Sequence, residues 1–560
     1  MRLKGGNKGP VNVRRAEMET VRNRLMVAVF LFVAAFLLLS ARMVGLGFSP
    51  VGQSGEHWTR GLPAYQAKRV DILDRNGVVL ATNLETSSLY ADPKKVQNPE
   101  AAVRKLAGVL PDLAVGNLLA RLKSDKRFVW VRRKLTPQQI YQVNALGLPG
   151  FFFQAEEQRV YPHGPLFAHL VGYVDIDGRG LGGIEYNFDE RLKNPLDADD
   201  NLVLSFDVRV QHALRDEMER AVRIFQAKAA AGIVLDVNNG EVLAMVSLPD
   251  FDPNFAGRAS ADQIFNRATN GVYELGSVFK TLTVAMGLDS GAITLADGYD
   301  ATKPLKVASY TITDDHPKAR YLTVPEIFIY SSNIGAAQMA LDIGAETQQA
   351  YFEKLGLFTA PFIEITEVGR PIYPAYWRDI NTMTAAYGHG IAISPLQLAS
   401  AVAATINGGY LIPATLVHEG EGFRMPGKKV FSPEVSEQMR ALMRLTVIEG
   451  TGRQADVPGY LVGGKTGTAE KPGEGVYQKH ATLSSFVGVF PMDRPRYLVL
   501  VVLDEPVGTK ETFNFSGGGW VAAPPVGRVI ARIAPILGVE PLANEVRGYQ
   551  EVALLVSDIP

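Results

Sequence analysis

Cysteine is absent from all 560 residues of the chain. Without thiols, the protein has no disulfide, no cysteine nucleophile and no thiolate metal site. The absence does not decide whether the surrounding compartment is oxidising or reducing. A location outside the cytoplasm is therefore permitted by the composition, but it does not follow from it.

An excess of charge of either sign is also missing, since 57 Lys and Arg stand against 58 Asp and Glu, for a formal net charge of -1. Such a chain has no overall field to attract a polyanion, so nucleic acid is not expected as a partner. Apolar residues make up 47% and charged residues 21%, which is typical of a globular protein. At 560 residues, two or more folded units are expected, because single cores rarely grow so large.

One apolar run near the amino terminus is long enough to cross a membrane. Residues Leu25 to Phe48, with Arg42 near the far end, number about 24 and would extend about 36 Å as a helix. The basic residues before it are Arg2, Lys4, Lys8, Arg14, Arg15, Arg22 and Arg24. By the positive-inside rule, the first two dozen residues stay in the cytoplasm and the bulk of the chain lies outside. A cleaved signal peptide and a buried core helix are the competing interpretations, but the run is long for a signal and lacks a polar stripe.

The region after this run is predicted to be rich in strands at first and then helical. Residues Val70 to Ala81 form two apolar runs that meet at Asn-Gly, a strong hairpin signal. From Pro99 to Leu146, apolar residues recur at three- and four-residue spacing, which predicts helix. The Gly-, His- and Asp-rich stretch 159–192 is interpreted as ordered loop. His163 and His169 lie in it without a regular ligand spacing, which favours histidines satisfied by backbone over a metal site.

The last part of the chain opens and closes with pairs of strands. Ala230 to Asp236 and Glu241 to Ser247 flank an Asn-Asn-Gly turn, while Ser484 to Phe490 and Tyr497 to Leu503 are joined through a turn with proline. Mostly helical segments lie between the two pairs, including 277–288 and 395–405. This order predicts an α+β domain in which one antiparallel sheet is closed by its two ends and covered by an inserted helical lobe.

A candidate nucleophile is Ser277, which opens the predicted helix as Ser277-Val278-Phe279-Lys280. The three-residue spacing places the serine hydroxyl and the lysine amine on one helical face. A serine needs a base to become nucleophilic, and a lysine can serve if burial and nearby positive charge leave it neutral. Taken alone, the pattern is common enough that an exposed helix lysine explains Lys280 as well.

A second candidate is Ser331-Ser332-Asn333, which follows an apolar stretch and precedes a small-residue helix. A second hydroxyl can pass on a proton, and a carboxamide can hold a substrate amide with donor and acceptor together. A helix N-cap is an equally good explanation of these residues taken alone.

The third candidate is Gly464-Lys465-Thr466-Gly467-Thr468, which is interpreted as a glycine-broken edge strand. Lys465 and Thr466 can bind a carboxylate, and Gly467 permits close approach of backbone to a ligand. Residues Gly459 to Thr466 also satisfy the phosphate-loop pattern of nucleotide hydrolases. That mechanism requires a helix directly after the lysine, which the following glycines and Pro472 oppose.

Together, the three strings resemble the S-x-x-K, S-D-N and K-T-G motifs of the penicilloyl-serine transferases. With the anchor, the block Arg69 to Gly77 and the block Arg159 to Gly164, the chain resembles class B penicillin-binding proteins over nearly its whole length. Asn333 resembles the division-specific branch, because elongation-specific relatives carry aspartate there. The resemblance implies a β-rich stalk of the dimerisation type and a transpeptidase domain with the serine β-lactamase-like fold. The expected division is a cytoplasmic tail (1–24), an anchor (25–48), the stalk (49–225), the transpeptidase domain (226–545) and a C-terminal tail (546–560).

The resemblance also implies a role for each motif residue. Ser277 would attack the penultimate D-Ala carbonyl of a stem peptide and form an acyl-enzyme that an amine of a neighbouring stem resolves, with Lys280 as general base. Ser331 and Asn333 would relay protons and hold substrate, while Lys465 and Thr466 would bind the substrate carboxylate. The N–H groups of Ser277 and Thr468 would form the oxyanion hole. No metal or organic cofactor is implied, and β-lactams would acylate Ser277.

Four alternative roles share parts of this pattern. A β-lactamase would need a Glu-x-x-Leu-Asn segment between Asn333 and Lys465, and none is found there. A D,D-carboxypeptidase differs only in acceptor access, and an elongation-specific enzyme shares the same motifs. A β-lactam sensor would need a larger cytoplasmic domain than the segment before the anchor. The resemblance implies an inner-membrane protein with a cytoplasmic N-terminus and a periplasmic catalytic domain, partnered by a polytopic glycan polymerase of the SEDS family and other division proteins.

Overall fold

The structure is a computed structural model that describes residues 69–194, 200–307, 310–420, 426–472 and 477–542, with only scattered positions between 26 and 40 before them. Within these described residues, no helix is both long and apolar enough to span a bilayer. The predicted anchor, Leu25 to Phe48, lies almost wholly outside the described residues. Two folded domains follow along the described chain, an N-terminal one built on strands β1 to β7 and a C-terminal one built on β8, β9 and β16 to β18.

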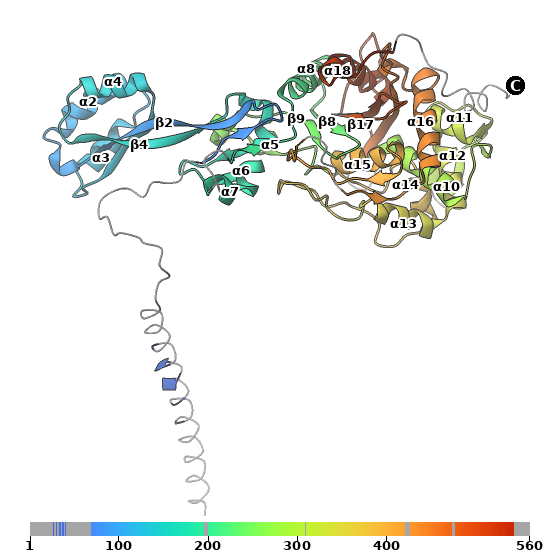
Figure 1. Cartoon of the computed structure of the whole chain (residues 1–560), viewed down its shortest axis with the longest axis horizontal. Coiled ribbons are helices and arrows are strands. Elements are labelled where there is room, and N and C mark those ends of the chain that lie inside the picture. The colour runs from blue at the N-terminus through green and yellow to red at the C-terminus, as the bar shows by residue number, and fades with distance from the viewer. Residues whose placement is uncertain are drawn as a thin grey trace, which may run out of the picture. The chain divides into compact units, whose positions relative to one another are not determined.

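The N-terminal domain is organised around one long strand, β2 (Val79–Ala91). It pairs with β1 (Ile72–Leu73) across the turn at Asn76-Gly77, so the predicted hairpin is confirmed. Further along its length, β2 pairs antiparallel with β3 (Val129–Leu135) and with β4 (Phe151–Val160), and β7 (Leu202–Val203) runs parallel to β1. Figure 1 shows β2 and β4 running side by side toward α2, α3 and α4.

The helical prediction for residues 99–146 is only partly right. Helices α2 (Pro99–Val109), α3 (Val115–Leu122) and α4 (Pro137–Ala145) are present, and they bury Leu106, Leu118 and Val143 against the sheet. Strand β3 interrupts them. Its sequence, Val-Trp-Val-Arg-Arg-Lys-Leu, is rich in β-branched and aromatic residues at its start, and this local preference for a pleated strand outweighs the helical spacing on both sides.

The stretch 159–192 is not the loop that its composition predicts. It contains η2 (Gly164–Phe167), α5 (Ala168–Val171), α6 (Gly183–Asn187), α7 (Asp189–Lys193) and the small hairpin of β5 (Tyr173–Val174) and β6 (Gly180–Gly182). Three of its glycines, Gly172, Gly180 and Gly183, allow close backbone packing: a Cβ on Gly172 would lie 1.8 Å from the carbonyl oxygen of Gly182. His169 Nε2 lies 2.7 Å from the Gln263 carbonyl oxygen, as expected of a histidine satisfied by backbone.

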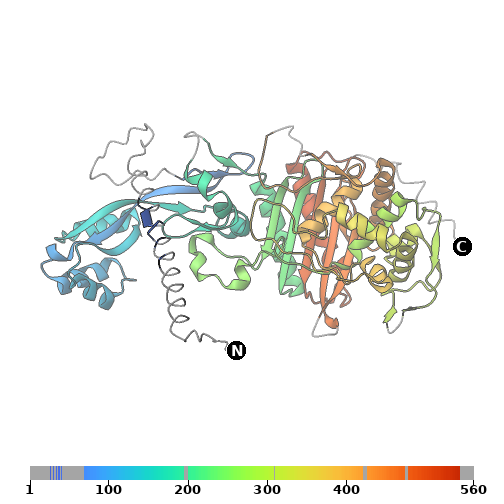
Figure 2. The same cartoon turned by 90° about the horizontal axis from the view of Figure 1, so that it is seen from below.

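The C-terminal domain contains a five-stranded antiparallel sheet in the order β16-β17-β18-β8-β9. Strands β8 (Ala229–Asp236) and β9 (Val242–Leu248) come first in the chain, and β16 (Gly463–Pro472), β17 (Tyr477–Phe490) and β18 (Tyr497–Asp504) come last. Because β18 pairs with β8, the two ends of the domain close one sheet, as predicted. Figure 2 shows the green strands β8 and β9 beside the orange and red strands of residues 463–504.

Helices cover both faces of this sheet. Helices α8 (Val208–Phe225) and α18 (Ala523–Ile536) pack on one face, and α10 (Lys280–Ser290), α15 (Pro395–Ile406) and α16 (Pro433–Ile448) form the lobe on the other (Figure 1). Helix α8 falls before the expected boundary at residue 226, yet it packs on β8, β9 and α18. We therefore propose that the C-terminal domain begins with α8.

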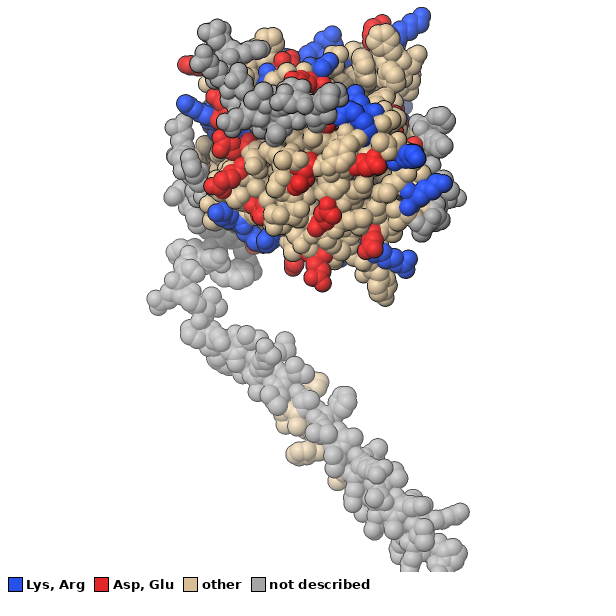
Figure 3. Space-filling model, turned by 90° about the vertical axis from the view of Figure 1, so that its right-hand side faces the viewer, with Lys and Arg blue, Asp and Glu red and all other residues tan. Residues whose placement is uncertain are grey.

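The charges on the face shown in Figure 3 do not gather into one basic surface. Acidic side chains are spread over the middle of this face among uncharged ones, and basic side chains lie mainly toward its edge. This face therefore offers no continuous basic patch of the kind that binds nucleic acid.

A buried ion cluster centred on a glutamate of α6 stabilises the N-terminal domain. Glu185 is fully buried, and its carboxylate accepts hydrogen bonds from Nε of Arg69 at 2.7 Å and from Nε of Arg159 at 2.6 Å. Both guanidinium groups are themselves buried. Removing the carboxylate would leave two buried positive charges without their shared partner.

We expect Glu185→Ala to lower the free energy of unfolding by about 3–5 kcal/mol, the usual loss when one partner of a buried ion pair is removed. Urea denaturation followed by circular dichroism measures this change. The matched control is Glu190→Ala, an exposed glutamate of α7, which should stay within about 0.5 kcal/mol of wild type. Equal stability of the two variants would contradict the structural role given to the cluster.

Candidate active site

Ser277 lies on a short 3-10 turn, η4 (Gly276–Phe279), that leads directly into α10. Gly276 has a φ of +60°, and a Cβ on it would lie 2.5 Å from the carbonyl oxygen of Thr468. On the facing strand, a Cβ on Gly467 would lie 2.6 Å from the Leu275 carbonyl oxygen. The two glycines therefore let η4 lie directly against β16, which brings the first and third sequence motifs together.

Lys280 is not an exposed helix lysine, since only 1% of it is accessible to solvent. Its Nζ lies 2.8 Å from Ser277 Oγ, 2.7 Å from the Ser331 carbonyl oxygen and 2.7 Å from Asn333 Oδ1. Burial, which disfavours the ammonium form, lowers the pKa of Lys280 to about 7, although the carboxylates of Asp314 and Asp315 act in the opposite direction. A substantial fraction of Lys280 is therefore neutral near neutral pH.

The second motif divides into two functions. Ser332 is the N-cap of α12 (Asn333–Ile343), and its Oγ accepts from the Gly335 N–H, so the N-cap explanation holds for this serine. Ser331 ends α11 (Val324–Tyr330) in the left-handed conformation, with a φ of +62°. Its Oγ lies 3.2 Å from Lys280 Nζ and accepts from Lys465 Nζ at 2.9 Å, so this hydroxyl connects the two lysines.

The third motif lies on β16, at the edge of the sheet, as predicted. Lys465 is fully buried, and burial together with the charge of Lys280 holds the pKa of Lys465 well below its ordinary value. Thr466 Oγ1 lies 2.8 Å from Thr451 Oγ1, and Thr468 Oγ1 accepts from the Gly518 N–H at 3.0 Å. Because Lys465 is followed by strand and not by helix, the phosphate-loop interpretation lacks the helix N-terminus that its mechanism requires.

The structure therefore brings together most of the predicted site residues around Lys280. A neutral amine has two N–H donors and one lone pair, and Lys280 has two close oxygens that can only accept, the Ser331 carbonyl and Asn333 Oδ1. When these take both donors, the lone pair faces Ser277 Oγ and can accept its proton. This is the arrangement of a serine nucleophile with a lysine base.

Sequence motifs did not identify every residue that holds this site. Asp314 accepts hydrogen bonds from Ser332 Oγ and from the N–H of Asn333. Thr313 accepts from Asn333 Nδ2 through its carbonyl oxygen. These residues lie about twenty positions before the second motif, in a stretch without a recognisable spacing, so only the folded chain shows the contact.

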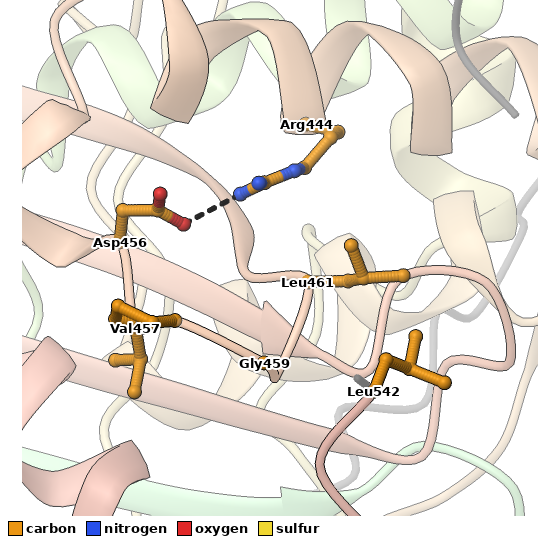
Figure 4. Close-up of a pocket in the computed structure, with 7 residues that line it drawn as sticks. Arg444, Asp456, Val457, Gly459, Leu461 and Leu542 are labelled. Atoms are coloured by element: carbon orange, nitrogen blue, oxygen red, sulfur yellow. Dashed lines mark hydrogen bonds and ion pairs between the residues drawn. The ribbon is translucent and has the colours of Figure 1, made fainter. Parts of the chain in front are cut away.

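A pocket lies beside the start of β16 and is separate from the cluster around Ser277. It is lined by Arg444, Asp456, Val457, Pro458, Gly459, Leu461 and Leu542 (Figure 4). Arg444 donates to Asp456 at 2.6 Å and to the Val462 carbonyl oxygen at 2.7 Å. This ion pair fixes the chain just before the strand that carries Lys465.

Comparisons with known proteins give matches to penicillin-binding proteins over almost the whole chain. A model of the penicillin binding protein transpeptidase domain matches residues 230–525, and a model of the penicillin-binding protein dimerisation domain matches residues 64–193. A protein of Caulobacter vibrioides named "Probable peptidoglycan D,D-transpeptidase FtsI" is 42% identical, covering 94% of this chain and 90% of the relative. The Escherichia coli protein named "Peptidoglycan D,D-transpeptidase FtsI" is 29% identical, covering 84% of each chain.

A solved structure shows the same fold. The chain is similar to penicillin binding protein 3 of Mycobacterium tuberculosis in complex with ampicillin, with a TM-score of 0.68, 23% identity, and coverage of 86% of this chain and 98% of the other. At this identity, the likeness concerns the fold alone.

The depressed pKa of Lys280 predicts a particular dependence of stability on pH. A lysine in an unfolded chain has a pKa near 10.4, so between about pH 7 and 10 the unfolded protein binds one proton more than the folded protein. This lysine therefore destabilises the fold fully below about pH 7, and the destabilisation disappears as the pH rises from about 7 to 10. Relative to the variant Lys280→Met, we expect the free energy of unfolding of the wild-type protein to rise by roughly 3 kcal/mol from pH 7 to pH 9.5.

Urea denaturation of both proteins at the two pH values measures this gain. Lys303→Met, which removes an exposed lysine of the same domain, serves as the control and should follow wild type at both pH values. Parallel behaviour of Lys280→Met and wild type would show that Lys280 keeps an ordinary pKa in the folded protein.

Proposed function

Because this chain belongs to the penicillin-binding proteins with a dimerisation domain and a transpeptidase domain, we propose that it is a serine-type peptidoglycan D,D-transpeptidase of cell division. The observation that carries the proposal is the 2.8 Å contact between Ser277 Oγ and the buried amine of Lys280. The relatives named peptidoglycan D,D-transpeptidases support peptidoglycan as the substrate, and its stem peptides are the acyl donors of the proposal. The geometry supports Ser277 as the nucleophile and Lys280 as its base.

In the acylation step, Lys280 Nζ takes the proton of Ser277 while Ser277 Oγ forms a bond to the carbonyl carbon of the penultimate D-Ala. The C–N bond to the terminal D-Ala then breaks. The departing nitrogen takes up one proton and leaves as the amine of free D-Ala, so atoms and charge balance. Ser331 supports this proton transfer, because its hydroxyl lies 3.2 Å from Lys280 Nζ and can pass the proton toward the leaving group.

The remaining motif residues are proposed to bind substrate. Lys465 and Thr466 would hold the terminal carboxylate, and the charge of a bound carboxylate would favour the ammonium form of Lys465, which burial disfavours. The N–H groups of Ser277 and Thr468 would face the developing oxyanion. The close packing of Gly276 against Thr468 supports this role, because it places the two segments next to each other.

The acyl-enzyme is resolved by an amine from a neighbouring stem peptide, which attacks the ester carbonyl and returns Ser277 to its hydroxyl form. A D,D-carboxypeptidase would use water at this step, and that remains the alternative activity of the same site. An elongation-specific role is the alternative assignment within the family. Asn333 and the FtsI relatives favour division.

We also propose that the chain is a single-pass inner-membrane protein anchored by residues 25–48, with its catalytic domain in the periplasm. The support is the apolar run with basic residues before it. By the same resemblance, the anchor and stalk would bind a polytopic SEDS-family glycan polymerase and other division proteins. β-Lactams would act as covalent inhibitors because the acyl product on Ser277 blocks the acceptor.

The first test is labelling of the purified chain with benzylpenicillin, followed by intact-protein mass spectrometry. We expect one stable adduct on the wild-type protein and none on Ser277→Ala, because Ser277 Oγ is the hydroxyl nearest the amine of Lys280, at 2.8 Å against 3.2 Å for Ser331 Oγ. Ser290→Ala, a serine at the other end of α10, is the matched control and should label as wild type does. An adduct that persists on Ser277→Ala would overturn the choice of nucleophile.

The rate of acylation is expected to depend on pH through Lys280. The base acts as the neutral amine, which is populated above its pKa of about 7, so the second-order rate constant should rise from pH 6 to 8 with a midpoint near 7. Stopped-flow measurement with a fluorescent penicillin gives this profile. A midpoint above pH 9 would mean that Lys280 is not the base in the form proposed.

A further inference from the structure

A carboxylate from outside the three motifs reaches into the second one. Asp314 follows the short strand β12 (Tyr310–Ile312), in the small lobe formed by β10 (Gly298–Asp300) to β13 (Tyr321–Thr323). It is partly buried, whereas its neighbour Asp315 is exposed. This lobe precedes α11, so the chain passes the site once with Asp314 and returns to it with Ser331.

The carboxylate of Asp314 closes the N-terminus of α12. Its Oδ1 accepts from the N–H of Asn333 at 2.6 Å and from the N–H of Ile334 at 3.0 Å, and its Oδ2 accepts from Ser332 Oγ at 2.7 Å. A helix of 11 residues begins here, and its first N–H groups have no partner within the helix. A negative charge at this end is also favoured by the helix dipole.

These contacts determine how Asn333 faces the catalytic lysine. Its backbone is held by Asp314, and its side-chain Nδ2 donates to the Thr313 carbonyl oxygen at 3.0 Å. With the nitrogen side of the amide taken by Thr313, Oδ1 points to Lys280 Nζ at 2.7 Å. The direction of the lone pair of Lys280 toward Ser277 therefore depends on where this amide oxygen lies.

Asp314 also belongs to the charged surroundings of Lys280. The groups that face this amine are Lys465 on β16, Asp314 and Asp315 after β12, and His389 after α14 (Asp379–Ala385). Both carboxylates raise the pKa of Lys280, and burial lowers it more strongly. Loss of the Asp314 charge would therefore move the pKa of Lys280 further down.

We propose that Asp314 is a positioning residue of the active site, which holds Asn333 and the start of α12 so that Lys280 is directed at Ser277. The proposal rests on the proposed acyl-serine function of this site. Asp314 acts through Asn333, with no direct contact to Ser277 or Lys280 required of it. Its three hydrogen bonds to residues 332–334 carry the argument.

The test measures acylation of the full-length chain by a fluorescent penicillin between pH 6 and 9 in wild type and three variants. Asp314→Ala removes all three hydrogen bonds and should lower the rate constant about 10- to 100-fold, as small displacements of catalytic groups do. Asp314→Asn keeps an amide oxygen for the two backbone N–H groups but loses the charge. The rate constant of Asp314→Asn should fall less than that of Asp314→Ala, and the midpoint of its pH profile should lie below that of wild type.

Asp315→Asn is the matched control, because it removes the adjacent exposed charge and none of the three hydrogen bonds. Its rate constant should stay within about threefold of wild type. A purely structural role of Asp314 would reduce the amount of protein that can be acylated, while the protein that does fold would reach the wild-type rate constant at high pH. If Asp314→Ala does not fold, the rate constant and the midpoint of the pH profile of Asp314→Asn test the positioning role.

The outcomes separate this proposal from the proposed function. Wild-type protein that is not acylated at Ser277 would contradict the function itself. Normal acylation in wild type, together with wild-type rates and midpoints in Asp314→Asn and Asp314→Ala, would overturn the positioning role and leave the function intact. A loss in Asp315→Asn as large as that in Asp314→Asn would also overturn it, because the charge alone would then account for the effect.

Discussion

The site depends on a lysine amine that is enclosed within the protein. Lys280 is 1% exposed, and its amine lies close to oxygens of Ser277 in the first motif and of Ser331 and Asn333 in the second. Removing an amine from water favours its neutral form, and a neutral amine among fixed acceptors has its lone pair in one direction. The same burial that weakens the fold near neutral pH thus produces the neutral amine that the proposed serine nucleophile needs as its base.

The backbone brings this amine and the third motif together by close approach. Glycines at 276 and 467 let η4 pack directly on β16, and the ion pair of Arg444 and Asp456 fixes the chain before that strand. Lys465 then reaches Ser331 Oγ from the sheet while Lys280 reaches it from the helical lobe. This hydroxyl thus lies between two lysines whose pKa values are both depressed, an arrangement that would give a proton a short path. The substrate carboxylate proposed for Lys465 would change the charge on that path.

The sequence predicted the features that local chemistry determines. Strand pairs around Asn-Gly turns, the helix after Ser277 and the edge strand at Lys465 follow from turn residues, periodicity and glycine spacing, and the structure contains all of them. Strand β3 and the short helices of residues 164–193 were missed, because short elements give too few periods to be recognised. The burial of Lys280 and the contact of Asp314 with α12 could not be predicted either, since both depend on segments that meet only in the folded chain.

The most direct test of this account is the titration of Lys280 itself, followed by 15N NMR of the full-length chain labelled at lysine Nζ and assigned with Lys280→Met. The account predicts a resonance that is absent from the variant and titrates near pH 7 in the wild-type protein. It also predicts that acylation of Ser277 by benzylpenicillin abolishes this titration or shifts its midpoint to another pH, because the neighbouring hydroxyl becomes an ester. A Lys280 resonance that titrates above pH 9 would contradict the central claim that burial makes this lysine the base of the site.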